Sequence, residues 1–438
     1  MAPDKAMWVE RARTLAFSLL ALLVAASIGV LLAAEPAHAK TFRVNSTGDR
    51  VDNNRGDGSC FTGRRIPVAF APDPQECTLR AAIQEANAAP GPHTINFNVL
   101  LNSATNDCDA TTKVCTISPG SFLGINKAVT IDGYTQNGAT ENTLTQPGKT
   151  NAVLKIELDG TFAGSFGLIF NIGASNSVIR GLVINNFGNG LRFDGSTGHQ
   201  VEGNFIGTDP EGISVEGNAT GVYVSTSDGS TIGGTLPAAR NLISGNLLFG
   251  VRLLSDSAGN TIQGNLIGTN KNGGPLGNDD VGVMLTSSGN GNRILFNSIY
   301  SNGGLGIDLG IADGVTPNDP DDPDTEANTL QNFPGISSAV TASGGPTTIT
   351  GALNSTPNST FTIQFFSSPA PDPSGFREGK TFIGQRSVTT NANGNAPFSF
   401  DFATAVPVSW RVTATATGVG GTSEFSRARI VVRPPISG

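Results

Sequence analysis

A glycine followed by alternating apolar residues recurs five times in the middle of the chain. The copies are 31, 29, 32 and 24 residues apart and begin at Gly190, Gly221, Gly250, Gly282 and Gly306. A second motif, apolar-x-Gly-Asn-apolar-apolar-Gly-Thr, falls between them at 201–208 and 262–269. One such unit cannot bury its apolar face alone, so we expect the units to stack about 4.8 Å apart, like strand upon like strand. The unequal spacing argues against a propeller and favours a parallel β-helix, in which one turn can bulge outward without disturbing the stack.

This repeat region resembles the pectate-lyase-like, right-handed parallel β-helix proteins. The resemblance implies such a β-helix at 120–312 and an all-β fold class. It implies no activity, because such scaffolds carry lyases, hydrolases and adhesins alike. Composition agrees with a β-rich chain that has many turns, since glycine is abundant at 56 residues and only 14% of the residues are charged.

Asparagine recurs at matching places in these units, at Asn204, Asn241, Asn265 and Asn297. Asn tolerates the left-handed turn conformation, and stacked Asn side chains can hydrogen-bond to one another. We therefore interpret the four residues as structural turn residues.

The N-terminus predicts export. Arg11 and Arg13 precede an apolar run at 15–34, and Ala37-His38-Ala39 has the small-x-small form of a cleavage site. We expect a signal peptide at 1–39. The alternative is an uncleaved anchor, because a run of about 20 apolar residues can span a bilayer. Both readings place the rest of the chain outside the cytoplasm, secreted or at the cell surface, and no later stretch is apolar enough to span a membrane.

The net charge of −8 contains no basic cluster. Nucleic acid and anionic lipid are therefore poor partners, because each requires clustered cations.

The four cysteines, in an exported chain, favour disulfides. Cys108 and Cys115 bracket a short polar loop and are expected to pair, which leaves Cys60 for Cys77. A zinc site is the alternative, although His93 and His199 do not sit at ligand spacing.

The segment 40–119 is predicted to cap the β-helix. It combines a strand at 41–44, an acidic loop and an amphipathic helix that begins after Thr78. The pattern VNSTGD…GDGSC…CTLRAAIQEANA resembles the CSLREA module of exported bacterial β-helix proteins. This chain has Thr78 and Ala81 where that family has Ser and Glu, so no capping box can close. We interpret the helix as a lid over the open end of the strand stack.

Catalytic constellations are incomplete in the sequence. Pectate lyases of this fold use an arginine base beside calcium-binding acids. The candidate arginines in this chain are Arg180, Arg192, Arg240 and Arg252. We expect no acid cluster beside any of them. Elements that resemble the acidic pair and the His-bearing loop of polygalacturonases occur in the wrong order, because His199 precedes Asp279 and Asp280. We therefore interpret Asp279 and Asp280 as turn residues and His199 as a turn or edge residue. Acids on neighbouring coils could form the carboxylate pair of a glycosidase, the candidates being Asp194, Glu202, Asp209, Glu211 and Glu216.

The junction at 313–333 is the most acidic stretch. Its carboxylates are candidate Ca²⁺ ligands, at Asp313, Asp319, Asp321, Asp322 and Asp324. The alternative is an extended, solvated linker. No other cofactor is predicted. The stretch GLGIDLG…DGVTPND…DTEANTLQNFP resembles the exit segment of these β-helix proteins, which implies an ordered junction.

Residues 334–438 alternate apolar and polar residues in short runs separated by turns, at 347–351, 361–366, 381–384, 398–402 and 410–416. About seven short strands of this kind predict an immunoglobulin-like β-sandwich. Its expected core is Phe361, Ile363, Phe365, Phe400, Trp410 and Val412.

Two functions follow from these observations. The first is a non-catalytic exported protein that uses the long β-helix face for adhesion or carbohydrate binding, with a polysaccharide or cell-surface glycan as partner. The second is a polysaccharide lyase or glycoside hydrolase that acts on an extracellular polysaccharide. The sequence specifies neither the ligand nor the oligomeric state.

Overall fold

The computed structural model describes residues 39–68, 72–311, 314–342, 344–369 and 378–434. Residues Ala39–Gly438 form one compact unit. The predicted signal peptide lies outside the described residues, except for Ala39. In the part of the chain that is described, no helix combines the length and apolar character needed to cross a membrane.

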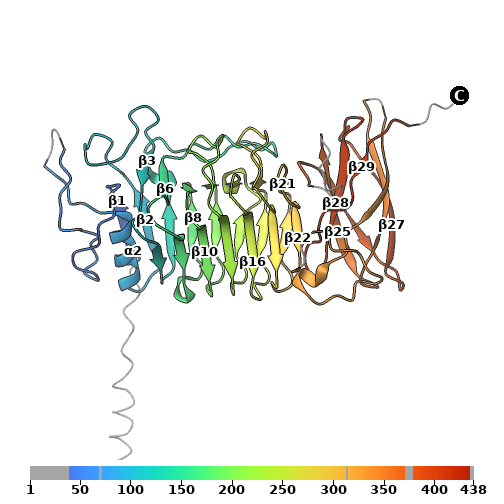
Figure 1. Cartoon of the computed structure of the whole chain (residues 1–438), viewed down its shortest axis with the longest axis horizontal. Helices are drawn as coiled ribbons and strands as arrows, with labels where there is room; N and C mark the ends of the chain where they lie inside the picture. The colour runs from blue at the N-terminus through green and yellow to red at the C-terminus, as the bar shows by residue number, and fades with distance from the viewer. Residues whose placement is uncertain (1–38, 69–71, 312–313, 343, 370–377, 435–438) are drawn as a thin grey trace, which may run out of the picture. The chain divides into compact units, whose positions relative to one another are not determined.

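Three parallel sheets run side by side along a stack of coils (Figure 1). The first sheet contains, in spatial order, β1 (Thr41–Val44), β2 (His93–Phe97), β5 (Val129–Asp132), β8 (Val178–Arg180), β11 (Gln200–Glu202), β14 (Thr231–Gly233), β17 (Thr261–Gln263) and β20 (Arg293–Leu295). The second contains β3 (Cys115–Ile117), β6 (Ile156–Asp159), β9 (Leu182–Asn185), β12 (Phe205–Ile206), β15 (Leu242–Ile243), β18 (Leu266–Ile267) and β21 (Ser298–Ile299). The third contains β4 (Leu123–Ile125), β7 (Phe166–Phe170), β10 (Asn189–Asp194), β13 (Thr220–Ser225), β16 (Phe249–Leu254), β19 (Val283–Thr286) and β22 (Ile307–Leu309). The predicted parallel β-helix is confirmed.

The recurring glycine motif forms the strands of the third sheet. Its first apolar residues pair from coil to coil, as Leu191, Val222, Val251, Val283 and Ile307. These side chains are buried. The residues that follow three of them, Arg192, Tyr223 and Arg252, are partly exposed, whereas Met284 and Asp308 are buried. Alternation therefore fills one continuous core that no single coil could form.

Three asparagine ladders line the turns. Asn204, Asn241, Asn265 and Asn297 form one ladder, in which each Nδ2 donates to the next Oδ1 at 2.9–3.1 Å. A second ladder contains Asn218, Asn246, Asn278 and Asn302, and a third contains Asn260, Asn292 and Asn328. The Nδ2 groups also donate to backbone carbonyls, so the amides satisfy buried turn backbone. The four predicted turn residues are thus structural hydrogen-bonding groups.

The N-terminal module is part of the stack and also its cover. β1 and β2 belong to the first sheet, so the predicted boundary at residue 119 does not separate the module from the β-helix. Helix α2 (Leu79–Ala88) lies at the blue end of the sheets and packs on their core (Figure 1). Asn87 accepts from the Asn126 N–H and donates to Gly124 O beside edge strand β4, so a helix side chain replaces a missing neighbour strand.

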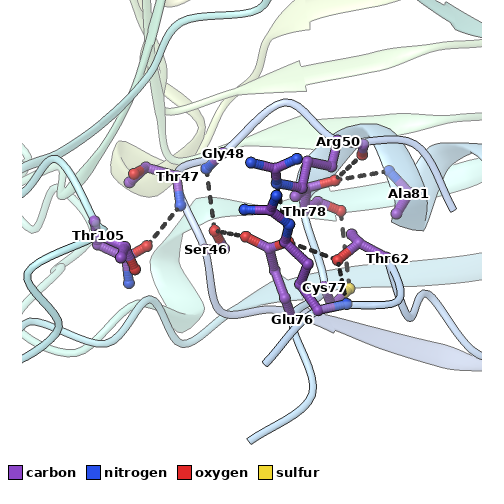
Figure 2. A network of polar contacts seen from close by, with 12 residues as sticks. Ser46, Thr47, Gly48, Arg50, Thr62, Glu76, Cys77, Thr78, Ala81 and Thr105 are labelled. Carbon is purple, nitrogen blue, oxygen red and sulfur yellow. Dashed lines mark hydrogen bonds and ion pairs between the residues drawn. The ribbon is translucent and has the colours of Figure 1, made fainter. Parts of the chain in front are cut away.

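Thr78 caps α2 as predicted. Its Oγ1 accepts from the Ala81 N–H at 3.0 Å and donates to Arg50 O at 2.6 Å (Figure 2). Beside it, Glu76 accepts from the hydroxyls of Ser46 at 2.9 Å and Thr62 at 2.5 Å. These bonds fold the acidic loop onto the start of the helix.

Both predicted disulfides are present, Cys60–Cys77 and Cys108–Cys115. No cysteine is left for a zinc site.

The segment 136–155, which we call the strap, crosses the second sheet. That sheet carries apolar side chains on its outer face, at Val183, Phe205, Leu242 and Leu266, and the strap covers them with Ala152 and Leu154. Thr150 N–H donates to Lys271 O at 2.9 Å, so the strap reaches a coil more than 100 residues later in the sequence. The strap gives the second sheet a buried outer face.

The C-terminal unit contains two antiparallel sheets that share one core. One sheet is β23 (Gly335–Thr341), β24 (Thr347–Asn354) and β27 (Asn395–Phe402), and the other is β26 (Thr381–Thr389), β25 (Thr360–Ser368), β28 (Arg411–Thr417) and β29 (Arg429–Ile430). Phe361, Ile363, Phe365 and Val412 are buried as predicted, but Phe400 and Trp410 are only partly buried at the edge of the core. Short 3-10 helices lie at Gly133–Thr135, Ile172–Ala174, Pro237–Ala239 and Ala327–Leu330.

Side chains of the C-terminal unit bond the last coil. Glu378 accepts from the Ser301 N–H at 2.5 Å and the Asn302 N–H at 2.9 Å. Glu424 accepts from the Leu309 N–H, and Gln364 accepts from the Phe296 N–H, both at 3.1 Å. The open end of the β-helix is therefore closed by side-chain acceptors together with single backbone bridges, Ile299 to Gly379 and Asn292 to Gly421.

Candidate functional site

The outer face of the third sheet carries a row of arginine and aromatic side chains. Arg192, Tyr223 and Arg252 occupy the same register position on β10, β13 and β16. Phe166 on β7 and Phe249 on β16 lie in a neighbouring row. We call these five residues the aromatic–arginine face, and all five are partly exposed.

Cation–π contacts hold the face together. The Arg192 guanidinium carbon lies 5.0 Å from the Phe166 ring centroid and 4.9 Å from that of Tyr223. The Arg252 guanidinium carbon lies 4.9 Å from the Phe249 centroid. Adjacent strands about 4.8 Å apart bring Arg192 beside Phe166 and Tyr223, although 26 and 31 residues separate them in the sequence, whereas Phe249 and Arg252 share β16.

The two guanidiniums differ in their hydrogen bonding. Arg192 pairs with Asp194, with an N–O distance of 2.9 Å. Arg252 makes no hydrogen bond or ion pair with any residue that the structure describes, and its Nε is buried. Because the residue is partly exposed, the other two guanidinium nitrogens keep their donors available for a ligand oxygen.

Sequence reasoning identified Arg192 and Arg252 but not their aromatic partners. The missed signal is the third residue of the glycine motif, which is Arg192, Tyr223 and Arg252 in three coils, while the matching Met284 and Asp308 are buried. Reading that position down the repeats gives most of the outer row.

Arg180 contradicts the prediction that no acid cluster adjoins the arginines. In the first sheet it lies in register between Asp132 and Glu202 on the neighbouring coils. Its guanidinium is 2.6 Å from Asp132 and 3.5 Å from Glu141 of the strap. The hydrogen bond to Asp132 raises the pKa of Arg180 further above its ordinary value, which makes Arg180 unsuitable as a base.

A carboxylate pair lies beside the second sheet. Asn185 Nδ2 donates to Glu157 Oε1 and to Glu216 Oε2, each at 2.8 Å, so the two carboxylates lie within about 6 Å of each other. Burial, with Glu157 as the nearest like charge, raises the pKa of Glu216 to about 7. Of the five predicted acids, only Glu216 enters a carboxylate pair of this kind, and its partner Glu157 was not predicted.

His199 and Arg240 have structural roles. The His199 ring is buried in the core and stacks on Phe193, with centroids 4.3 Å apart. His199 lies at the turn before β11, as predicted. Burial lowers the pKa of His199 to about 4, so the ring is neutral at pH 7. Arg240 donates to Leu144 O and Lys149 O and thereby holds the strap. Asp279 and Asp280 lie outside the strands, as expected of turn residues.

Three acids of the junction come together. The carboxylate oxygens of Asp319, Asp322 and Asp324 lie within 4.8 Å of one another. Asp319 Oδ1 is buried without a hydrogen-bond partner among the described residues, whereas Asp322 accepts from Gln331 and Ser355. Burial raises the pKa of Asp322 and of Asp324. Asp321 is not part of this group, and Asp313 lies outside the described residues.

Comparison with known proteins gives one family match. Residues 140–318 match the model of a family described as "Periplasmic copper-binding protein (NosD)". None of the curated proteins compared with the chain matches its sequence. The matched stretch is the central part of the β-helix.

The chain is also similar to solved structures. Tailspike protein 2 of Escherichia coli O157:H7 bacteriophage CAB120 shares 10% identity over 90% of this chain, with a TM-score of 0.28. The A-module of the Azotobacter vinelandii mannuronan C-5 epimerase AlgE4 shares 17% identity over 51% of this chain and 74% of its own, with a TM-score of 0.21. The chain spans 64% of the tailspike's length. At these scores neither likeness carries an argument about function.

The copper in the family description does not fit the described residues of this chain. Copper sites use imidazole, thiolate or thioether ligands. His93 and His199 are both buried in the core, Met284 is nearly so, and all four cysteines form disulfides. The one group of three metal-ligand residues in the described ranges is the Asp319, Asp322 and Asp324 cluster, which offers only carboxylate oxygens.

Proposed function

We propose that this chain is an exported, non-catalytic protein that binds polysaccharide along the aromatic–arginine face. The observation that carries the proposal is the contact series Phe166, Arg192, Tyr223 on adjacent coils, with Arg252 and Phe249 beside it. The extracytoplasmic location is supported by the predicted signal peptide and by the periplasmic description of the matching family.

The chemistry of the face suits a sugar polymer. Aromatic rings present flat apolar surfaces on which the C–H faces of sugars can stack. Guanidiniums donate paired hydrogen bonds to hydroxyls and, more strongly, to carboxylates. A flat parallel sheet repeats these groups coil after coil, which matches a ligand that is itself a repeat.

Affinity electrophoresis through gels containing polygalacturonate, alginate or neutral xylan tests this proposal. We expect retardation by at least one polysaccharide, stronger for the two acidic polymers. The double variant Arg192→Ala/Arg252→Ala should lose affinity at least about tenfold, because two charge-assisted contacts of about 1 kcal/mol each disappear. Arg427→Ala, an exposed arginine elsewhere, is the matched control. Unchanged mobility of the wild-type chain in all three gels would refute the proposal.

The carboxylate pair supports a second candidate, a glycoside hydrolase. Retaining glycosidases place two carboxyl groups about 5–5.5 Å apart and keep one protonated near neutral pH. Glu157 and Glu216 meet the distance requirement approximately, and the pKa of Glu216 is about 7. Release of reducing ends from any of the three polysaccharides, abolished in Glu216→Gln, would establish this activity in place of simple binding.

A further inference from the structure

Phe296 stands at a position that is glycine in two other coils of the first asparagine ladder and Arg240 in a third. Gly203 and Gly264 directly precede the ladder residues Asn204 and Asn265, with φ of 63° and 71°. Phe296 directly precedes Asn297 and has the same left-handed backbone, with φ of 56°. A bulky residue in this conformation costs about 1–2 kcal/mol relative to glycine, and such strained residues concentrate at functional sites.

The Phe296 ring lies between two cavities. Each cavity has a volume of about 330 Å³, and Phe296 contributes to the lining of both. The ring makes an edge-on contact with Phe382, with centroids 5.0 Å apart, and is only partly buried. These cavities are at the lower end of the size range of small-molecule sites.

The first cavity joins the last coil to the C-terminal unit. Its walls combine Arg293 of β20 with Thr360 and Thr362 of β25 and Gln385 of β26. The Arg293 guanidinium makes no hydrogen bond or ion pair with any residue in the described ranges, and its side chain is exposed. No carboxylate lines this cavity.

The second cavity lies beside the strap. It is lined by Thr145 of the strap, by Gln263 of β17 and by the exposed Leu236, among others. Hydroxyl and amide groups again alternate with apolar surface.

We propose that these two cavities form one groove that binds a short oligosaccharide bearing a carboxylate, with Phe296 as the stacking platform and Arg293 as the carboxylate contact. The inference rests on the proposed function, that the chain binds polysaccharide, and adds a second site on a different sheet. Hydroxyls, an amide, one free guanidinium and an aromatic ring are the groups that recognise a sugar acid.

Isothermal titration of the full secreted chain with hexagalacturonate, and separately with cellohexaose, tests the groove. We expect hexagalacturonate to bind, and both Phe296→Gly and Gln385→Ala to weaken that binding at least about tenfold. Phe296→Gly installs the residue found at the matching positions Gly203 and Gly264, so the left-handed backbone is retained. Gln385 is exposed on β26 but accepts from Gln364 Nε2 at 3.1 Å, so the Tm of Gln385→Ala is measured beside its binding to separate loss of that bond from loss of a ligand contact.

Variants of the two faces separate the two proposals. Arg192→Ala/Arg252→Ala should weaken retention by polymer gels and leave binding of hexagalacturonate to the groove intact. Arg293→Ala should weaken binding of hexagalacturonate to the groove and leave retention by polymer gels intact. Absence of hexagalacturonate binding, or binding unchanged in Phe296→Gly and Gln385→Ala, would overturn the groove. Binding of hexagalacturonate with equal affinity in wild type and Arg293→Ala would overturn the role of the guanidinium.

Discussion

Glu424 is a buried carboxyl that bonds the end of the β-helix. Burial raises the pKa of Glu424 to about 8, and Asp308 adds to this, while hydrogen bonds from the Leu309 and Thr316 N–H groups oppose it. The side chain is therefore protonated in the folded chain at neutral pH, whereas an unfolded chain would ionise it near pH 4.5. The folded state holds a proton that the unfolded state releases.

The sign of the resulting pH dependence follows from linkage. The stability linked to Glu424 is fully present below pH 4.5 and is lost as the pH rises toward about 8. We predict that Tm falls between pH 5 and 8, and that Glu424→Gln reduces this slope because glutamine does not titrate. The pKa values of Glu216 and Asp52 are also raised, so these groups contribute to the fall of Tm with pH. The test therefore compares the change of Tm with pH in wild type and in Glu424→Gln, measured by calorimetry. If the Tm of Glu424→Gln fell with pH as steeply as that of wild type, the raised pKa of Glu424 would be contradicted.

Asn265 is an inner member of the ladder formed by Asn204, Asn241, Asn265 and Asn297. Its Nδ2 donates to Ile232 O and Asn297 Oδ1, and its Oδ1 accepts from Asn241. Asn265→Ala should lower the free energy of unfolding by about 2–4 kcal/mol, because several buried polar groups lose partners at once. The exposed turn residue Asn272, changed to Ala, should cost less than about 0.5 kcal/mol in the same urea titration.

At the scale of elements, the acidic junction is ordered by the sheet that it contacts. Asp322 bonds Gln331 and Ser355, and Asn332 bonds Asp319 O and Asn354 O, so the junction is fixed against β24 (Thr347–Asn354). The predicted extended linker is therefore not what the structure shows. Ca²⁺ binding by the three clustered carboxylates remains a proposal.

Calcium should raise Tm if the cluster binds it. Asp319, Asp322 and Asp324 supply three of the six to eight oxygens that Ca²⁺ requires. At millimolar Ca²⁺ we expect an increase of a few degrees, abolished in Asp324→Asn and retained in Asp321→Asn, whose side chain is outside the cluster. No increase in the wild-type chain, measured by differential scanning fluorimetry with and without chelator, would remove this proposal.

At the scale of the whole described unit, both ends of the β-helix are closed by side chains from other elements. Asn87 and Arg80 of α2 bond backbone groups near β4, and Glu378 and Glu424 bond the last coil. Unpaired strand edges would otherwise template further pairing between chains. The closures therefore favour a soluble stack of defined length.

Glu378 should be the most costly of these closures to remove. It accepts from two backbone N–H groups and from Asn302 Nδ2, which ends the second ladder. Glu378→Ala leaves those donors buried, so we expect a loss of about 2–5 kcal/mol in unfolding free energy and a greater tendency to aggregate. Glu378→Gln retains one acceptor oxygen and should cost less. Equal stability of Glu378→Ala and wild type, measured by urea denaturation with light scattering, would refute this view of the end.

The sequence by itself determined the repeat and its consequences. Periodic glycine and alternating apolar residues sufficed for the β-helix, because a coil of that size must stack to bury its apolar face. Matching Asn204 and Asn265 indicated structural turns, and cysteine spacing indicated the two disulfides. These properties depend on local pattern, which the sequence contains.

Only the tertiary structure decided which outward side chains meet. Arg180 met Asp132, and Glu216 met Glu157, because strand register and loop path place residues from different coils a few ångströms apart. The strap and the C-terminal unit also create surfaces, such as the groove at Phe296, that no single coil encodes. Sequence spacing carries no information on such distances, because a coil of 24 and a coil of 32 residues advance the stack by the same rise.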